Sequence, residues 1–214
     1  MFQKELRSEL RTRTSFLSSG LFSVVAVVAI SLATTGAKID ATVGAGLLWV
    51  TLLFSSIISL PRMFISEEES GTADLLRLMA RPHAVYWGKT LFNCAQMLLT
   101  AFVLSFLFLM FVGLEVHGVP FYIVSIIGGC IALAFAVTLC GALVAGATNR
   151  SALAAAIAVP LLLPLVAVGV GAVRVAFGAT SQVSGGWMSA MGLYAYGILL
   201  AATGPYLYAA VWKD

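Results

Sequence analysis

The sequence predicts an all-α membrane protein in which residues 1–214 form a single transmembrane domain with six spanning helices. Two observations predict this class: hydrophobic residues make up 61% of the 214 residues, and charged residues only 10%. A soluble domain carries about 25% charged residues, because water must solvate its surface. A chain this apolar, with a mean hydropathy of +1.03, must use lipid as the solvent for much of its surface.

The segment that precedes the first span is predicted to be a short amphipathic helix over residues 1–14, lying in the headgroup plane. Phe2, Leu6 and Leu10 recur every four residues, with acidic and basic residues between them. This spacing gathers the apolar side chains on one face of a helix. A frayed basic tail is the alternative, and the interleaving of both charge signs favours the helix.

Charged residues divide the rest of the chain into apolar runs whose lengths suit membrane helices, which need about 20 residues each. The runs are residues 13–38, 40–62, 89–115, 115–150, 150–174 and 187–212. The fourth run, of about 34 residues, is too short for two passes and a turn. Residues 178–186 read GATSQVSGG and are predicted to be a loop before the sixth run.

The distribution of Lys and Arg predicts the orientation of this six-span arrangement. Ten of the 12 Lys and Arg residues fall on one side of the membrane, and only Lys38 and Arg174 fall on the other. The ten are Lys4, Arg7, Arg11, Arg13, Arg62, Arg77, Arg81, Lys89, Arg150 and Lys213. Cytoplasmic segments carry the excess of cations in membrane proteins, so both termini are predicted to lie in the cytoplasm.

Two prolines and one arginine in the fifth run are candidate functional positions. Pro160 and Pro164 lie inside the run, where proline kinks a helix or opens its hydrogen-bond ladder. They predict either a hinge or a fixed feature of helix packing. Arg174 lies at the outer end of the run, where it either contacts a carboxylate of the substrate or extends to the lipid headgroups.

The sequence contains no pattern typical of an enzyme or of a nucleotide, metal or nucleic-acid site. No Asp, Glu or His interrupts the predicted spans, whereas intramembrane proteases and proton-coupled pumps place such groups there. Residues 83–90 read HAVYWGKT, but a phosphate-binding loop needs glycine where His83 stands. Cys94, Cys130 and Cys140 lie in apolar runs without paired spacing. We therefore expect no cofactor, no metal and no nucleic acid on this chain.

Residues 61–89 form the one sizeable polar stretch on the predicted cytoplasmic side. Ser66 and Glu69 have the spacing of a capping box, and Gly71 and Thr72 interrupt the helix that it would begin. A second short helix is predicted over residues 73–79, ending before a proline. Its apolar side chains are Leu75, Leu76, Leu78 and Met79.

An apolar helix face outside the membrane must be buried against lipid or against another protein. The acidic residues Glu67, Glu68 and Glu69 oppose binding to an anionic membrane surface. We therefore favour docking into a groove of a cytosolic partner over an ordinary surface helix. The residues predicted to couple to that partner are Glu67, Glu68, Glu69, Gly71, Asp74, Leu75, Leu76, Arg77 and Leu78.

The string over residues 67–76, EEESGTADLL, resembles the E-x-E-x-G-T-x-E-x-L signature that follows the second span of type-2 ABC exporter membrane subunits. Nearly the whole chain resembles the CcmB family, the haem exporter membrane subunit of cytochrome c maturation. The further matching segments are KELRSELR at 4–11, GLLWV at 46–50, RMF at 62–64 and PLLLP at 160–164. Asp74 stands where the exporter signature more often has Glu, which keeps the charge.

The resemblance implies a permease subunit without catalysis of its own, located in the bacterial inner membrane. It implies that a soluble ATPase, CcmA, binds ATP and receives the coupling helix, that a second copy of the chain is present, and that CcmC, CcmD and CcmE are partners. The cargo would be haem, or the work would be the release of a haem-loaded chaperone. Two alternatives stay open: the same architecture with a lipid, drug or polysaccharide as cargo, and a channel or membrane scaffold without an ATPase.

Overall fold

A computed structural model of the chain describes residues 6, 14–35, 38–59, 71, 76, 78–144, 150–179 and 183–211. Within these residues the chain forms six long helices and no strand. The helices are α2 (Thr14–Ala33), α3 (Ala41–Ser59), α6 (Pro82–Val112), α7 (Val119–Val144), α8 (Arg150–Ala176) and α9 (Val183–Val211). The all-α prediction is therefore confirmed for the described part of the chain.

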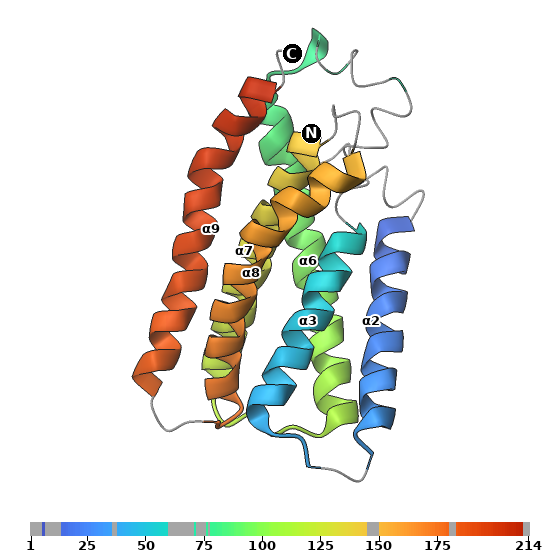
Figure 1. Cartoon of the computed structure of the whole chain (residues 1–214), viewed down its shortest axis with the longest axis vertical. Coiled ribbons are helices and arrows are strands. Elements are labelled where there is room, and N and C mark those ends of the chain that lie inside the picture. The colour runs from blue at the N-terminus through green and yellow to red at the C-terminus, as the bar shows by residue number, and fades with distance from the viewer. Residues whose placement is uncertain are drawn as a thin grey trace.

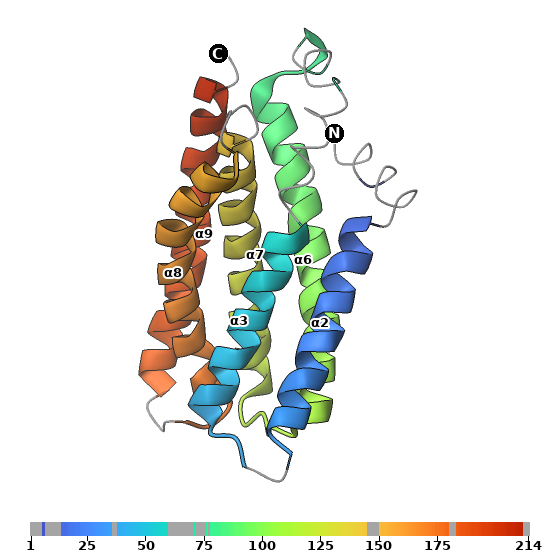
Figure 2. The same ribbon diagram turned by 45° about the vertical axis from the view of Figure 1, so that its right-hand side comes forward.

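The six helices lie side by side along the long axis of the molecule, and consecutive helices run in opposite directions (Figures 1 and 2). In Figure 1, α6 begins and α7 ends at the upper end of the bundle. At the lower end, short connections join α2 to α3, α6 to α7 and α8 to α9. We use "upper end" and "lower end" in this sense throughout.

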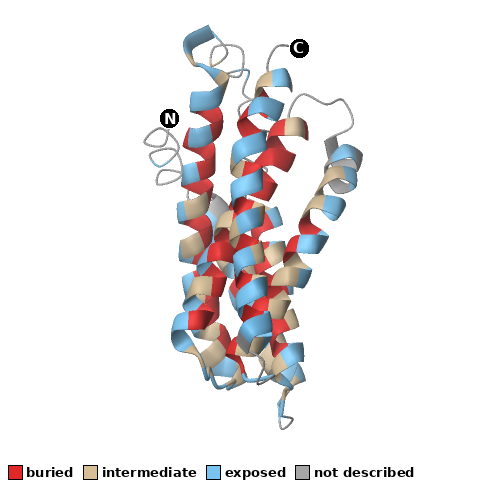
Figure 3. Ribbon diagram, turned by 90° about the vertical axis from the view of Figure 1, so that its left-hand side faces the viewer, coloured by how far each residue is buried: buried red, intermediate tan, exposed pale blue. Residues whose placement is uncertain are grey.

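Helix α7 is the most deeply buried helix of the bundle, and it contacts α3, α6, α8 and α9. Its sequence carries no charged residue, and 19 of its 26 residues are buried inside the protein. Figure 3 shows buried residues along the inner faces of the helices and exposed residues on their outer faces. Among the exposed side chains are large apolar ones such as Leu21, Phe102 and Leu163, as expected of helices that face lipid.

Five of the helices, α2, α3, α6, α7 and α8, are long and apolar enough to cross a membrane by length and composition. Helix α9 is not among these five, because glycines, serines, a threonine and Pro205 lower its apolar content. Its 29 residues nevertheless extend about 44 Å, which exceeds the roughly 30 Å of a bilayer core. A sixth crossing therefore stays a prediction.

Two of the predicted boundaries between loops and helices differ from the structure. Helix α9 begins at Val183, inside the predicted 178–186 loop. Gly186 in its first turn packs closely, since a β-carbon there would meet Val175 and Phe121 at 2.9 and 3.0 Å. Helix α6 begins at Pro82, so its first two turns lie within the predicted 61–89 loop. Proline suits the first turn of a helix, where its missing N–H has no intrahelical partner to lose.

Trp49 of α3 is the largest side chain that is completely buried, with no exposed surface. Its indole ring lies against Gly129 of α7 and Gly169 of α8, and a β-carbon at either glycine would overlap the ring. We call these three residues the Trp49 junction. Small residues allow membrane helices to pack closely, and at this junction two glycines make room for one aromatic ring.

Candidate functional site

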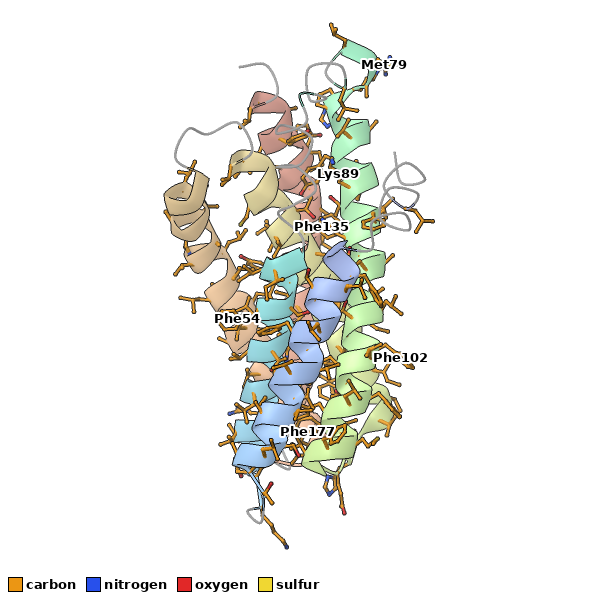
Figure 4. All side chains as sticks on the ribbon, turned by 90° about the vertical axis from the view of Figure 1, so that its right-hand side faces the viewer. Phe54, Met79, Lys89, Phe102, Phe135 and Phe177 are labelled. Atoms are coloured by element: carbon orange, nitrogen blue, oxygen red, sulfur yellow. The ribbon has the colours of Figure 1, made fainter. Side chains whose placement is uncertain are left out.

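The segment that was predicted to dock on a partner extends beyond the upper end of the bundle. We call residues 76–80 the docking segment; the structure describes residue 76 and residues 78–80 of it. Leu78 and Met79 are helical and expose 86% and 78% of their surfaces. Figure 4 shows Met79 at the far tip of the molecule, beyond the end of the bundle. The docking segment therefore presents two large apolar side chains away from the rest of the fold.

The other side of the docking segment packs on the bundle. Leu76 and Ala80 contact a cluster of four buried residues, and the N–H of Ala80 donates a 3.0 Å hydrogen bond to the carbonyl of Leu76. The four residues are Val85 and Tyr86 of α6, Ala142 of α7 and Tyr208 of α9. The rings of Tyr86 and Tyr208 lie 5.8 Å apart. The segment thus packs against a cluster to which three helices contribute.

A single residue separates the docking segment from α6. Arg81 is the N-cap of α6 and has extended backbone angles, with φ −76° and ψ 140°. Residues that precede proline avoid the helical region, so Pro82 explains why the chain turns here instead of continuing one long helix. A displacement of the docking segment would reach α6 through this short link.

Most of the predicted coupling residues lie outside the described residues: Glu67, Glu68, Glu69, Asp74, Leu75 and Arg77. The same is true of the amphipathic helix predicted over residues 1–14, apart from Leu6 and Thr14. Gly71 is described, is exposed, and has a φ of +67°. Glycine adopts this left-handed conformation without the steric penalty of other residues.

Pro160 and Pro164 both lie within α8 and are exposed. None of the described side chains of α8 before Leu162 is buried, and this part of the helix diverges from its neighbours (Figure 3). The hydroxyl of Tyr196, on α9, donates a 2.7 Å hydrogen bond to the carbonyl of Leu161. This bond ties α9 to α8 between the two prolines. Whether the prolines act as a hinge stays a prediction.

Arg174 is exposed in the last turn of α8 at the lower end, and its carbonyl accepts a 3.0 Å hydrogen bond from the N–H of Ala179. Nearby, the N–H of His117 donates a 2.9 Å hydrogen bond to the carbonyl of Ala176. A contact of Arg174 with substrate stays a prediction. Within the described residues, no group of three His, Cys, Asp or Glu side chains could hold a metal ion.

One feature near the upper end was missed by the sequence reasoning. Lys89, predicted to lie in the cytoplasmic loop, is in the second turn of α6 and exposes only 1% of its surface. Asn93 and Gln96, with 0% and 7% exposed, follow on the same face of α6. The spacing of four and three residues indicates a shared face and could have revealed the row. We call Lys89, Asn93 and Gln96 the polar stripe.

Comparison with known proteins places this architecture in a family. A sequence model described as "CcmB protein" matches residues 1–211. A protein from Pseudomonas aeruginosa PAO1 named "Heme exporter protein B" is 28% identical to the chain over 134 residues, which are 62% of this chain and 60% of that protein. The matched part thus spans somewhat less than two thirds of the curated relative. Because the family model covers nearly the entire sequence, this multi-pass membrane protein belongs to the CcmB family.

Proposed function

We propose that this chain is the membrane subunit of an ATP-driven ABC transporter complex that serves haem export in c-type cytochrome biogenesis. The observation that carries the proposal is the exposed apolar pair Leu78 and Met79 in a chain that matches the CcmB family from residue 1 to residue 211. The relative named "Heme exporter protein B" supports haem as the transported molecule, or as the group carried by a chaperone that the complex releases.

The docking segment would enter a cleft of a separate cytosolic ATPase, a CcmA-like subunit. Burying Leu78 and Met79 there would stabilise the complex, because removing large apolar side chains from water contributes about 1.5–3 kcal/mol each. The acidic residues 67–69 would then face a protein surface and not an anionic membrane. The chain itself would hydrolyse no ATP; the partner would bind the nucleotide.

Motion of the ATPase would reach the membrane by two routes. One runs through Arg81 into α6, whose 31 residues extend about 46 Å and so exceed the thickness of a bilayer core. The other runs through Leu76 and Ala80, which pack against a cluster formed by residues of α6, α7 and α9. Pushing the segment would therefore move three helices together, because closely packed elements shift as units.

The upper end would face the cytoplasm of a bacterial cell, with the protein in the inner membrane. Ten of the 12 Lys and Arg residues would then lie on the cytoplasmic side, as the distribution of cations in membrane proteins favours. A second copy of the chain would form the other half of the membrane part of the transporter. CcmC-, CcmD- and CcmE-like proteins would join the assembly on the outer side or within the membrane.

The test is to replace Leu78 and Met79 together with serine and to purify the chain from native membranes. We expect co-purification with the ATPase to fall at least tenfold, because two apolar contacts worth more than about 1.4 kcal/mol would be lost. Leu32→Ser is the matched control, since Leu32 is 71% exposed at the other end of the bundle and should leave co-purification unchanged. An unchanged yield of ATPase with the double variant would refute the proposal.

A further inference from the structure

Tyr86 of α6 lies beneath the docking segment, at the point where α6 meets α9. It belongs to the four-residue cluster that Leu76 and Ala80 contact, and its side chain exposes none of its surface. In Figure 1 the first turns of α6 lie beside the last turns of α9 at the upper end of the bundle, and the two helices are in contact. A displacement of the docking segment therefore acts directly on the surroundings of this tyrosine.

The ring of Tyr86 packs against α9 at a glycine. A β-carbon at Gly204 would lie 2.6 Å from Cζ of Tyr86 and closer still to the hydroxyl oxygen, so a larger residue there would displace the tyrosine. The ring of Tyr208, also on α9, lies 5.8 Å from that of Tyr86. Residues 204, 205 and 208 of α9 are all buried and share one side of the helix. The hydroxyl of Tyr86 is therefore directed at the backbone of α9.

The hydroxyl of Tyr86 has no hydrogen-bond partner in this arrangement, although it is buried. An unpaired buried hydroxyl lowers the stability of the fold, and folded proteins pair nearly all such groups. A phenylalanine would fill the same space without this cost. The retention of the hydroxyl is explained by a second arrangement of α6 and α9 that supplies an acceptor.

Pro205 provides such an acceptor next to the hydroxyl. Proline has no N–H, so the carbonyl of Ala201, four residues earlier in α9, does not receive the usual helical hydrogen bond. In an α-helix the carbonyl of residue 201 points toward residue 205, and so lies beside Gly204, which the Tyr86 hydroxyl contacts. A donor without a partner and an acceptor freed by proline thus face each other across the contact between α6 and α9.

We propose that Tyr86 is the positioning residue that couples the docking segment to α9, by donating to the carbonyl of Ala201 once the segment has moved. This inference rests on the proposed function, in which an ATPase displaces the segment. The displacement shifts the first turns of α6 against α9 and brings the hydroxyl to the carbonyl. The new hydrogen bond stabilises the shifted arrangement relative to the one described, so the pair of helices has two discrete positions, as elements that transmit a conformational change do.

The test replaces Tyr86 with phenylalanine, which removes the hydroxyl and keeps the ring. The variant is expressed in a bacterium whose own copy of the gene is deleted, and the rate of c-type cytochrome formation is followed by haem staining. We expect Tyr86→Phe to lower that rate about fivefold, the effect of one neutral hydrogen bond. A rate equal to that of the unmodified chain would overturn the inference.

Two measurements separate this effect from a loss of structure. Unfolding of Tyr86→Phe in mixed micelles titrated with sodium dodecyl sulfate should show no loss of stability, because the hydroxyl makes no bond in the arrangement described. Co-purification of the ATPase should be unchanged, because Tyr86 is buried and the exposed Leu78 and Met79 are retained. A destabilised variant, or one that no longer retains the ATPase, would refute the assignment.

A second substitution identifies the acceptor. Pro205→Ala restores the missing N–H, so the carbonyl of Ala201 is bonded within α9 and no longer receives the tyrosine hydroxyl. We expect a fall in rate similar to that of Tyr86→Phe, and no further fall in the double variant, because both substitutions remove the same hydrogen bond. Independent effects would instead multiply to about 25-fold, and that outcome would exclude the shared bond.

Each of these substitutions has a matched control. Tyr122→Phe removes another buried tyrosine hydroxyl without a partner, and Pro120→Ala removes a proline from the first turn of α7, where no helical carbonyl is freed. Both should leave the rate of cytochrome formation unchanged. A fivefold fall in Tyr122→Phe would show that the loss of any buried hydroxyl slows the process, and the special role of Tyr86 would be lost.

Deletion of the whole chain tests the proposed function separately. Normal cytochrome formation without the chain would remove the proposed function, and this inference with it. Formation that requires the chain but proceeds at the full rate in Tyr86→Phe would remove the inference alone. The two failures are therefore distinguishable in the same cells.

Discussion

The Trp49 junction and the polar stripe are both buried, but they contribute to the protein in opposite ways. At the junction, one aromatic ring from α3 fills the space left by glycines on α7 and α8, and only the indole N–H lacks a partner. In the stripe, three polar side chains occupy space inside the bundle while three of their amide atoms make no hydrogen bond. The Trp49 junction stabilises the bundle by close packing, whereas the polar stripe keeps buried polar atoms without hydrogen-bond partners.

The difference shows how function can be recognised in a chain without catalytic motifs. Helices in a membrane gain little from the hydrophobic effect among themselves, so close packing holds them together. A region that fits closely therefore needs no explanation beyond stability. A region that keeps unpaired polar atoms in a low-dielectric interior lowers stability, and its retention calls for a ligand or a partner. Substitutions at the two sites should consequently change stability in opposite directions.

Trp49→Ala should produce the largest effect. Removing a fully buried indole leaves a cavity bounded by three helices, and such substitutions cost about 3–5 kcal/mol. The measurement is the free energy of unfolding in mixed micelles titrated with sodium dodecyl sulfate. Phe102→Ala is the control, because Phe102 is a large aromatic residue that is 73% exposed and should change the free energy by about 0.5 kcal/mol or less. Equal losses in the two variants would show that Trp49 does not hold the helices together.

Gly129→Ala tests the same junction from the opposite helix. The added β-carbon would overlap the Trp49 ring, and overpacking of this kind costs about 1–3 kcal/mol. Gly46→Ala on α3 is the matched control, since a β-carbon there meets nothing within 4 Å. In the control, alanine should stabilise the helix by up to about 1 kcal/mol through its better helix propensity. The same unfolding titration measures both, and a stabilised Gly129→Ala would contradict the packing described.

Gln96→Met should move stability the other way. Both polar atoms of Gln96 are unpaired, so an apolar side chain of similar size removes a desolvation penalty without breaking a bond, a gain of about 1 kcal/mol. Asn93→Leu should gain less, because it also loses the hydrogen bond to Thr138. A clear loss of stability in Gln96→Met would mean that the stripe is structural, which would remove the contrast with the Trp49 junction.

Local patterns in the sequence predicted where the helices lie along the chain, but not which helices pack against one another. The apolar runs between charged residues correspond to α2, α3, α6, α7 and α8, because length and composition decide whether a segment suits a membrane. The position of Lys89 relative to the lipid stays a prediction, but its secondary structure differs from the predicted loop, because α6 begins at Pro82. Proline ends the preceding helical segment and also suits the first turn of the next helix.

The contacts of Trp49 show why the remaining features could not be derived from local spacing. The indole meets residues 80 and 120 positions away in the sequence. Helices that are apolar on all sides carry no periodic signal for the face that meets a neighbour, since lipid and protein interior favour the same side chains. Which aromatic ring packs against which pair of glycines depends on the assembled fold. The predicted coupling residues 67–69 stay untested, because they lie outside the described residues.

Ser23→Ala should produce the smallest effect. It extends the comparison of the Trp49 junction and the polar stripe to a third kind of site, a buried polar side chain whose hydrogen bonds are made. The hydroxyl oxygens of Ser23 on α2 and Ser55 on α3 lie 3.2 Å apart, and Ser23 also donates to the carbonyl of Ser19 at 2.8 Å. Hydrogen bonds between membrane helices contribute about 0.6 kcal/mol on average, so we expect a loss of that order in the unfolding titration. Thr203→Ala, which removes an exposed bond within α9, should change almost nothing. A loss at Ser23 as large as that of Trp49→Ala would contradict the view that close fit, and not polar pairing, holds these helices together.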